Sequence, residues 1–196
     1  MNCALMISHN NIKKLGQKCS ILVALCLLGG APGASRGELP SEYQIKGAFL
    51  YKFATFVEWP KASFADSKEP VVIGILGRDP FGTMLDQIVL GKTVRGRKME
   101  IKRLDKVEGM EPCHILFISS SKKRQLAKIF NQLEDASVLT VGEMEWFARD
   151  GGMLGLVIKD ERVQFEINPG RAERSGLKIS SDLLKLAKIV DPRGTP

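Results

Sequence analysis

Short, continuously apolar runs recur along the chain from residue 71 onward. The three clearest runs cover residues 71–76 (VVIGIL), 115–119 (ILFIS) and 138–141 (VLTV). None of them alternates between apolar and polar positions, which is typical of strands buried on both faces of a parallel sheet. A turn and an amphipathic segment follow each run, so the pattern predicts helices over 80–90, 121–133 and 143–149.

The remaining periodic segments complete this layout. Residues 99–104 alternate between apolar and polar, which predicts a strand at the edge of the sheet. Residues 153–158 and 162–167 flank a polar turn and predict a hairpin. The capping residues at 180–182 open a last helix, whose apolar face holds Leu183, Leu184, Ala187 and Val190.

Strands that alternate with helical segments indicate the α/β class. We expect a single domain with a mixed, largely parallel central sheet flanked by helices, and with a C-terminal β-hairpin and helix. No internal repeat or interdomain linker interrupts the sequence.

A predicted first helix over residues 42–59 has an unusual feature. Its apolar arc contains Phe49 and Phe53, and Lys46 falls inside the same arc. The lysine either extends its ammonium to water or pairs with an acid, or it binds an anionic ligand. Trp59 belongs to an aromatic cluster at the end of this helix, where packing on the sheet is the simpler interpretation.

The N-terminal segment has the layout of a secretory signal peptide. Lys13, Lys14 and Lys18 precede the apolar stretch 19–28, and small residues follow over 29–35. A stretch of ten residues, apolar except for Ser20, is too short for a bilayer core, which needs roughly 20 apolar residues. We therefore expect residues 1–34 to be a signal peptide that is removed on export, and residues 35–196 to form the α/β domain.

Composition then narrows the function. The chain carries 29 Lys and Arg against 22 Asp and Glu, so its formal net charge is +7, and its basic residues are too dispersed for a nucleic-acid interface. Residues 35–196 hold one cysteine, Cys113, and one histidine, His114, so no intrachain disulfide is possible after cleavage. Cys113 precedes a buried run and is expected to be buried and inert.

Chemistry-bearing motifs are scarce. Within residues 35–196 no complete G-x-S-x-G, H-E-x-x-H or C-x-x-C pattern occurs. In the glycine-bearing turn 77–82, the residue that follows, Thr83, stands where a phosphate loop needs lysine. We therefore predict no enzymatic activity, no metal site and no cofactor. The turns at 77–82, 119–121 and Gly142 should share one edge of the sheet, where they are either ordinary caps or a crevice for a ligand.

A second polar cluster lies between the hairpin and the last helix. It contains Asn168, Arg171, Arg174 and Lys178. Arg171 and Arg174 are three positions apart and would be neighbours on a short helix. The cluster either grips an anion or an acidic patch of a partner, or is an ordinary solvated face.

Motifs over nearly all of residues 42–190 resemble those of the YfiR/HmsC-like periplasmic proteins. They are EYQIKGAFLYKFATFVEWP (42–60), VIGILGRDPFG (72–82), GKTVRGR (91–97), CHILFIS (113–119), LTVG (139–142), GGM (151–153), FEIN (165–168) and GLKISSDLLKLAKIV (176–190). They occur in the same order as in that family.

The resemblance implies a periplasmic α/β protein without enzymatic activity. It implies a regulator that binds and represses the periplasmic sensory domain of an inner-membrane diguanylate cyclase, and so lowers cyclic di-GMP signalling and biofilm formation. It also implies a homodimer. The disulfide of the family's best-understood repressor has no counterpart here, because Cys113 stands alone after cleavage.

A regulator of this kind needs a contact surface rather than catalytic groups. We expect the first helix, through Lys46, Phe49, Phe53 and Trp59, and the segment with Asn168, Arg171, Arg174 and Lys178 to contribute to partner or ligand binding. The alternative is a periplasmic receptor for an anionic or aromatic small molecule, which binds at the strand-end turns with Lys46 as counter-charge and signals to a sensor kinase or transporter.

Overall fold

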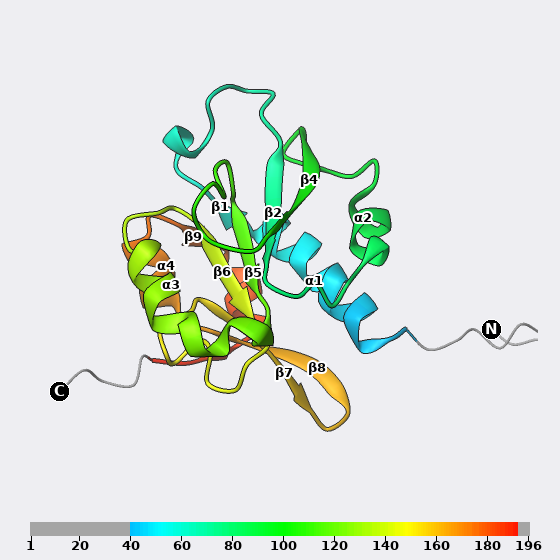
Figure 1. The fold of residues 1–196 in the computed structure, drawn as a ribbon, viewed down its shortest axis with the longest axis vertical. Helices are drawn as coiled ribbons and strands as arrows, with labels where there is room; N and C mark the ends of the chain where they lie inside the picture. The colour runs from blue at the N-terminus through cyan, green and yellow to red at the C-terminus, as the bar shows by residue number, and fades with distance from the viewer. Residues whose placement is uncertain (1–39, 192–196) are drawn as a thin grey trace, which may run out of the picture. The chain divides into compact units, whose positions relative to one another are not determined.

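An eight-stranded sheet forms the centre of the described part of the chain, residues 40–191 of a computed structural model (Figure 1). In spatial order its strands are β10 (Lys188–Ile189), β8 (Arg162–Ile167), β7 (Leu154–Lys159), β6 (Leu139–Gly142), β5 (Ile115–Ile118), β2 (Val71–Leu76), β4 (Arg97–Leu104) and β3 (Thr93–Val94). The pairs β7–β8 and β3–β4 are antiparallel, and all other neighbours in this sheet are parallel. The predicted mixed, largely parallel sheet of a single α/β domain is confirmed.

Helices cover both faces of the sheet (Figure 1). They are α1 (Glu42–Phe56), α2 (Thr83–Val89), α3 (Leu126–Gln132), α4 (Pro169–Arg174) and α5 (Ser181–Leu186), with 3₁₀ turns η1 (Lys61–Ser63) and η2 (Ser120–Gln125). A separate two-stranded ladder pairs β1 (Val57–Glu58) with β9 (Lys178–Ile179). Within residues 40–191, no helix has the length and apolar content that a membrane span requires.

The central strands divide their side chains between two cores. In β5, Ile115 and Phe117 pack in the core that α1 covers, whereas Leu116 and Ile118 pack in the core that α3 covers. This division follows from the alternation of side chains along a strand. It explains why the central strands β2 and β5 have no polar side chain at any position, as predicted.

The first helix begins where the sequence predicts and ends earlier. Ser41 and Gln44 form a capping box that fixes the start of α1. The prediction that the helix continues to Trp59 is wrong, because Val57 and Glu58 leave the helix and pair with β9. The backbone N–H of Ser180 donates to the carbonyl oxygen of Phe56 at 2.9 Å, which ties the helix end to the start of α5.

The predicted helix over 143–149 is not formed; the segment is a series of turns. Phe147 is buried, and its ring occupies the space where a Cβ at Gly142 or Gly152 would lie. The chain therefore folds back tightly over the end of β6. Trp146 adopts a φ of 64°, a left-handed conformation that a helix excludes.

Three other predicted elements need smaller corrections. The helix expected over 121–133 starts as the 3₁₀ turn η2 and becomes α-helical only at Leu126. The last helix is capped by Ser180 as expected, but it ends at Leu186, because residues 188–189 pair with β8. The predicted edge strand is β4, which pairs with the short β3 only through Arg97 and Lys98.

Candidate functional site

The turns that follow β2, β5 and β6 lie at one edge of the sheet, as the sequence predicts for parallel strands. The backbone N–H of Arg78 donates to Ser121 Oγ at 3.0 Å, and the hydroxyl of Ser121 donates to Ser119 Oγ at 3.2 Å. Gly77 has a φ of 92°, and any side chain on it would collide with Ser121. These hydrogen bonds therefore join the turn after β2 to the turn after β5, and they occupy the hydroxyl groups of Ser119 and Ser121.

A groove of about 580 Å³ opens beside these strand ends, next to the start of α1 and along β7. We call it the strand-end groove; its lining consists of Glu42, Tyr43, Lys46, Ser120, Glu143, Glu145, Leu156, Val157 and Ile158. One side is polar and comes from α1 and the turn after β6. The other side is apolar and comes from the protruding β7–β8 hairpin (Figure 1).

Lys46 is the most buried charged group in the strand-end groove, with only 4% of its surface exposed. Its ammonium lies 2.6 Å from Glu143 Oε2 and also forms an ion pair with Glu42. Of the alternatives that the sequence leaves open for Lys46, the structure shows pairing with acids and not an ammonium extended to water. Burial alone would lower the pKa of Lys46, but the hydrogen bonds with Glu143 and Glu42 outweigh burial and raise the pKa.

The lining of the strand-end groove is acidic overall. Glu42, Glu143 and Glu145 face a single cation, Lys46, whose charge Glu42 and Glu143 already neutralise. Burial and the nearby Glu143 carboxylate raise the pKa of Tyr43, so its hydroxyl stays protonated at neutral pH. This groove therefore favours cationic groups, and Lys46 is not available as a counter-charge for an anion.

The predicted aromatic residues have packing partners inside the domain. Phe53 is fully buried; its ring lies 5.7 Å from that of Phe49 and 5.3 Å from that of Phe165. Its assignment to a contact surface is therefore wrong. Phe49 and Trp59 are half-buried, and Trp59 Nε1 donates to the carbonyl oxygen of His114 at 3.1 Å.

The second predicted cluster is built around α4. Asn168 is buried and caps this helix: its side-chain oxygen accepts from the N–H of Arg171, and its amide group donates to the carbonyl oxygen of Ala148. The prediction that Asn168 contacts a partner is therefore wrong. Arg171 is half-buried and points a guanidinium N–H toward the carbonyl oxygen of Leu133 at 3.4 Å. Arg174 and Lys178 are exposed.

The two groups of predicted residues lie at different places. Lys46 is near the start of α1, whereas Lys178 pairs with Glu58 just beyond its end. Ten residues of α-helix separate Lys46 from Phe56, which is about 15 Å at 1.5 Å per residue. The structure therefore does not bring Lys46 together with Arg174 and Lys178.

The single described histidine and cysteine are part of the core. The N–H of Val72 donates to His114 Nδ1 at 3.1 Å, so the ring proton is on Nε2, which donates to the carbonyl oxygen of Ser63 at 3.0 Å. Burial lowers the pKa of His114. Cys113 is buried as predicted, and burial raises the pKa of its thiol to about 12.

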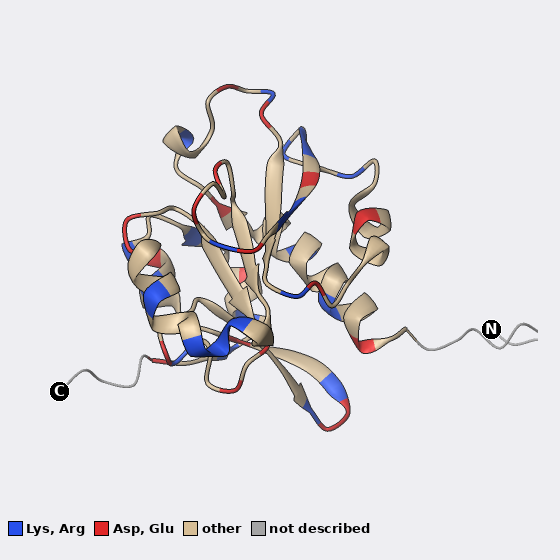
Figure 2. Cartoon of the chain, viewed as in Figure 1, with Lys and Arg blue, Asp and Glu red and all other residues tan. Residues whose placement is uncertain are grey.

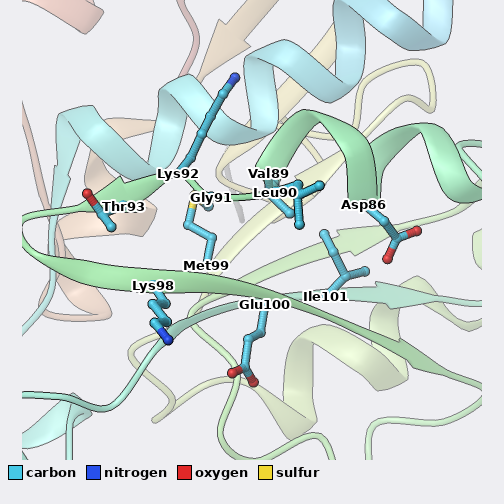
Figure 3. A pocket seen from close by; sticks show the side chains of 10 residues that line it. All are labelled: Asp86, Val89, Leu90, Gly91, Lys92, Thr93, Lys98, Met99, Glu100 and Ile101. Atoms are coloured by element: carbon cyan, nitrogen blue, oxygen red, sulfur yellow. The ribbon is translucent and has the colours of Figure 1, made fainter.

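A second hollow of about 480 Å³ lies between the end of α2 and β4. Figure 3 shows its side chains coming from both elements and from the turn that joins α2 to β3. Its one acid on α2, Asp86, is bound by Arg103 at 2.6 Å, and this hydrogen bond lowers the pKa of Asp86. Leu90 at its rim is 80% exposed. This hollow lacks the converging polar groups of the strand-end groove.

Charge is otherwise spread over the surface. Figure 2 shows Lys and Arg on most elements, several of them along η2 and α3, and acidic residues on other helices, strands and turns. In residues 40–191 no group of three or more His, Cys, Asp or Glu side chains is arranged to hold a metal ion.

Sequence reasoning missed most of the strand-end groove. Glu143 directly follows Gly142, which the sequence places in a turn at the end of a buried strand. This position could have identified Glu143 as a candidate site residue. Glu145 lay in a segment predicted to be helical. Ile158 belonged to the predicted hairpin, whose exposure only the structure reveals.

Comparison with models of known protein families matches residues 43–188 to a family described as YfiR/HmsC-like. The match runs from the second residue of α1 to the first residue of β10, and it includes the α4 cluster and all of the groove lining except Glu42. It extends over most of the chain.

Proposed function

Because the chain belongs to the YfiR/HmsC-like family, we propose that it is a periplasmic, non-enzymatic regulator of an inner-membrane diguanylate cyclase. In this proposal it binds the periplasmic sensory domain of the cyclase and represses it, which lowers cyclic di-GMP and biofilm formation. The signal peptide over residues 1–34 lies outside the described residues and is part of the proposal. The proposal also includes a homodimer as the functional form of the protein.

The observation that carries this proposal is the family match, which spans nearly the whole described domain. The surroundings of His114 and Cys113 in the structure support it. His114 has both ring nitrogens bonded to backbone groups, and Cys113 is a buried, protonated thiol. Neither is placed to act as a base or a nucleophile.

The mechanism needs no covalent step. A protein that binds one conformation of a sensory domain more tightly than another shifts the equilibrium between them by that difference in affinity. A shift from 1:99 to 99:1 requires about 5.5 kcal/mol of differential binding. A surface that combines exposed apolar area with a charged rim can supply energy of this size.

The test uses cells that lack the gene. We expect deletion to raise cyclic di-GMP and biofilm mass, and the intact gene to restore both. Crosslinking in intact cells, followed by mass spectrometry of the membrane fraction, should recover a diguanylate cyclase with this protein. An unchanged cyclic di-GMP level together with no crosslinked cyclase would refute the proposal.

A further inference from the structure

Strand β7 has an open edge inside the strand-end groove. Its first two residues pair with β6, as Val141 with Leu154 and Gly142 with Gly155. From Leu156 to Lys159 it pairs only with β8, on its other side, among the residues that the structure describes. Leu156, Val157 and Ile158 line the groove.

The hairpin turn decides which backbone groups face that edge. Asp160 and Glu161 have φ values of 50° and 59°, which is the conformation of a two-residue type I′ turn. Lys159 and Arg162 flank this turn and form its hydrogen-bonded pair. Because hydrogen-bonding direction alternates along an antiparallel strand, the N–H and C=O of Ile158 point away from β8 and toward the groove.

The side chains around this edge form one apolar wall and one acidic wall. Ile158 is 57% exposed, which is unusual for a large aliphatic side chain, and it gives the edge an apolar surface. Across the groove lie Glu143 and Glu145, on the turn after β6, and Glu42 at the start of α1. One backbone edge, one apolar wall and one acidic wall therefore face the same space.

We propose that the strand-end groove binds an extended peptide segment of the partner protein, which adds to the free edge of β7 as a new strand. Pairing with the backbone of Ile158 would supply affinity, as in other complexes formed by strand addition. Side chains of an added strand alternate between its two faces. The occupant is therefore a segment in which Lys or Arg residues, toward the glutamates, alternate with aliphatic residues. This inference rests on the proposed function only in taking a protein as the partner.

The first test measures binding of defined peptides to the purified protein. A nine-residue peptide of alternating Lys and Val, blocked at both ends, is compared with a Glu–Val peptide of the same design by fluorescence anisotropy. We expect the Lys–Val peptide to bind at least tenfold more tightly and to protect the amide of Ile158 from hydrogen exchange. Equal binding of both peptides, or no binding, would overturn the inference.

The second test separates charge from strand pairing. Glu145→Lys should weaken Lys–Val binding at least fivefold, whereas Glu134→Lys, on the segment before β6 and so at the other end of that strand, should change it less than twofold. Ile158→Pro removes the outward N–H and leaves the β8 pairing of the hairpin intact, and Ile158→Ala removes only the side chain. We expect the proline variant to bind at least tenfold more weakly than the alanine variant, with circular dichroism confirming that both are folded.

Each remaining outcome is informative. If Ile158→Pro and Ile158→Ala bind equally, strand addition is wrong. If the peptides fail to bind but Ile158→Pro converts a dimer to a monomer, the edge of β7 joins two copies of this chain instead, and the inference is wrong. Deletion cells separate this inference from the proposed function. If deletion raises cyclic di-GMP but the purified protein binds no peptide, peptide binding in the strand-end groove is wrong and the proposed function stands. If the protein binds the peptide but deletion leaves cyclic di-GMP unchanged, regulation of a diguanylate cyclase is wrong and the groove inference stands.

Discussion

The ammonium of Lys46 lies 2.6 Å from Oε2 of Glu143, although the two residues are 97 positions apart in the chain. The ion pair joins the first helix to the turn after β6, and both side chains are at least nine-tenths buried. A buried charge is costly unless it is paired. The contact therefore fixes α1 against the edge of the sheet at the strand-end groove.

Lys46→Met should destabilise the protein strongly. The variant leaves the Glu143 carboxylate buried without its partner, and removal of one member of a buried ion pair typically costs about 3–5 kcal/mol. Replacing both residues, as in Lys46→Met with Glu143→Leu, should recover much of this loss because no buried charge remains. Urea unfolding of the single and double variants measures both free energies.

Glu42→Gln is the matched control for this pair. Glu42 also contacts Lys46, but its side chain is 40% exposed. Solvent screening limits such a contact to about 1 kcal/mol or less. If Glu42→Gln lowers the free energy of unfolding as much as Lys46→Met does, the ion pair with Glu143 is not the main interaction that stabilises the buried Lys46.

The elements that the sequence predicted well are those with local signals. Continuous apolar runs predict the buried strands, helical periodicity predicts the start of α1, and capping residues such as Ser180 predict the start of α5. The ends of both helices were missed, since they depend on pairing with distant strands: Val57 with Ile179, and Lys188 with Glu166. Local periodicity contains no information about such partners.

The candidate site also depends on contacts between residues that are distant in sequence. Lys46 stood out because its charge fell on an apolar helix face, but its partner Glu143 is far away in sequence. Phe53 and Asn168 were assigned to a surface and are buried, because residue type alone does not reveal which side of an element the sheet covers. Tertiary packing therefore decides most of the site.

His114 should make stability depend on pH in the mildly acidic range. Its pKa in the folded protein lies below the ordinary value of about 6.5, so the unfolded chain binds a proton first as the pH falls. The stabilisation is fully present above pH 6.5, and it decreases below that by at most about 1.4 kcal/mol per pH unit. Urea midpoints at pH 7.5, 6.0 and 5.0 measure this slope.

His114→Asn provides the comparison. An asparagine oxygen can accept the N–H of Val72 but has no proton to gain in this range. The variant should therefore be less stable at pH 7.5 and show a smaller slope between pH 7.5 and 5.0. An unchanged slope would mean that other groups cause the pH dependence.

Cys113 should be unreactive until the protein unfolds. Its thiol has a pKa of about 12 in the folded state, whereas the thiolate is the reactive form. We expect negligible labelling by a maleimide at pH 8 in the native protein and complete labelling in guanidinium chloride. The exported protein should then carry one label per chain, because Cys3, Cys19 and Cys26 lie in the predicted signal peptide; four labels would contradict removal of that segment.

Charge reversal at Arg174 and Lys178 tests the second predicted contact region. Both side chains are exposed, so Arg174→Glu with Lys178→Glu should change the free energy of unfolding by only about 0.5 kcal/mol at each site. If this basic face meets an acidic patch of the partner, the double variant should lose repression and raise cyclic di-GMP toward the level of deletion cells. Lys123→Glu with Arg124→Glu, on the exposed surface of η2, is the control of equal charge and should keep repression. Equal loss in both double variants would indicate a general effect of net charge and would exclude a specific role for the α4 region.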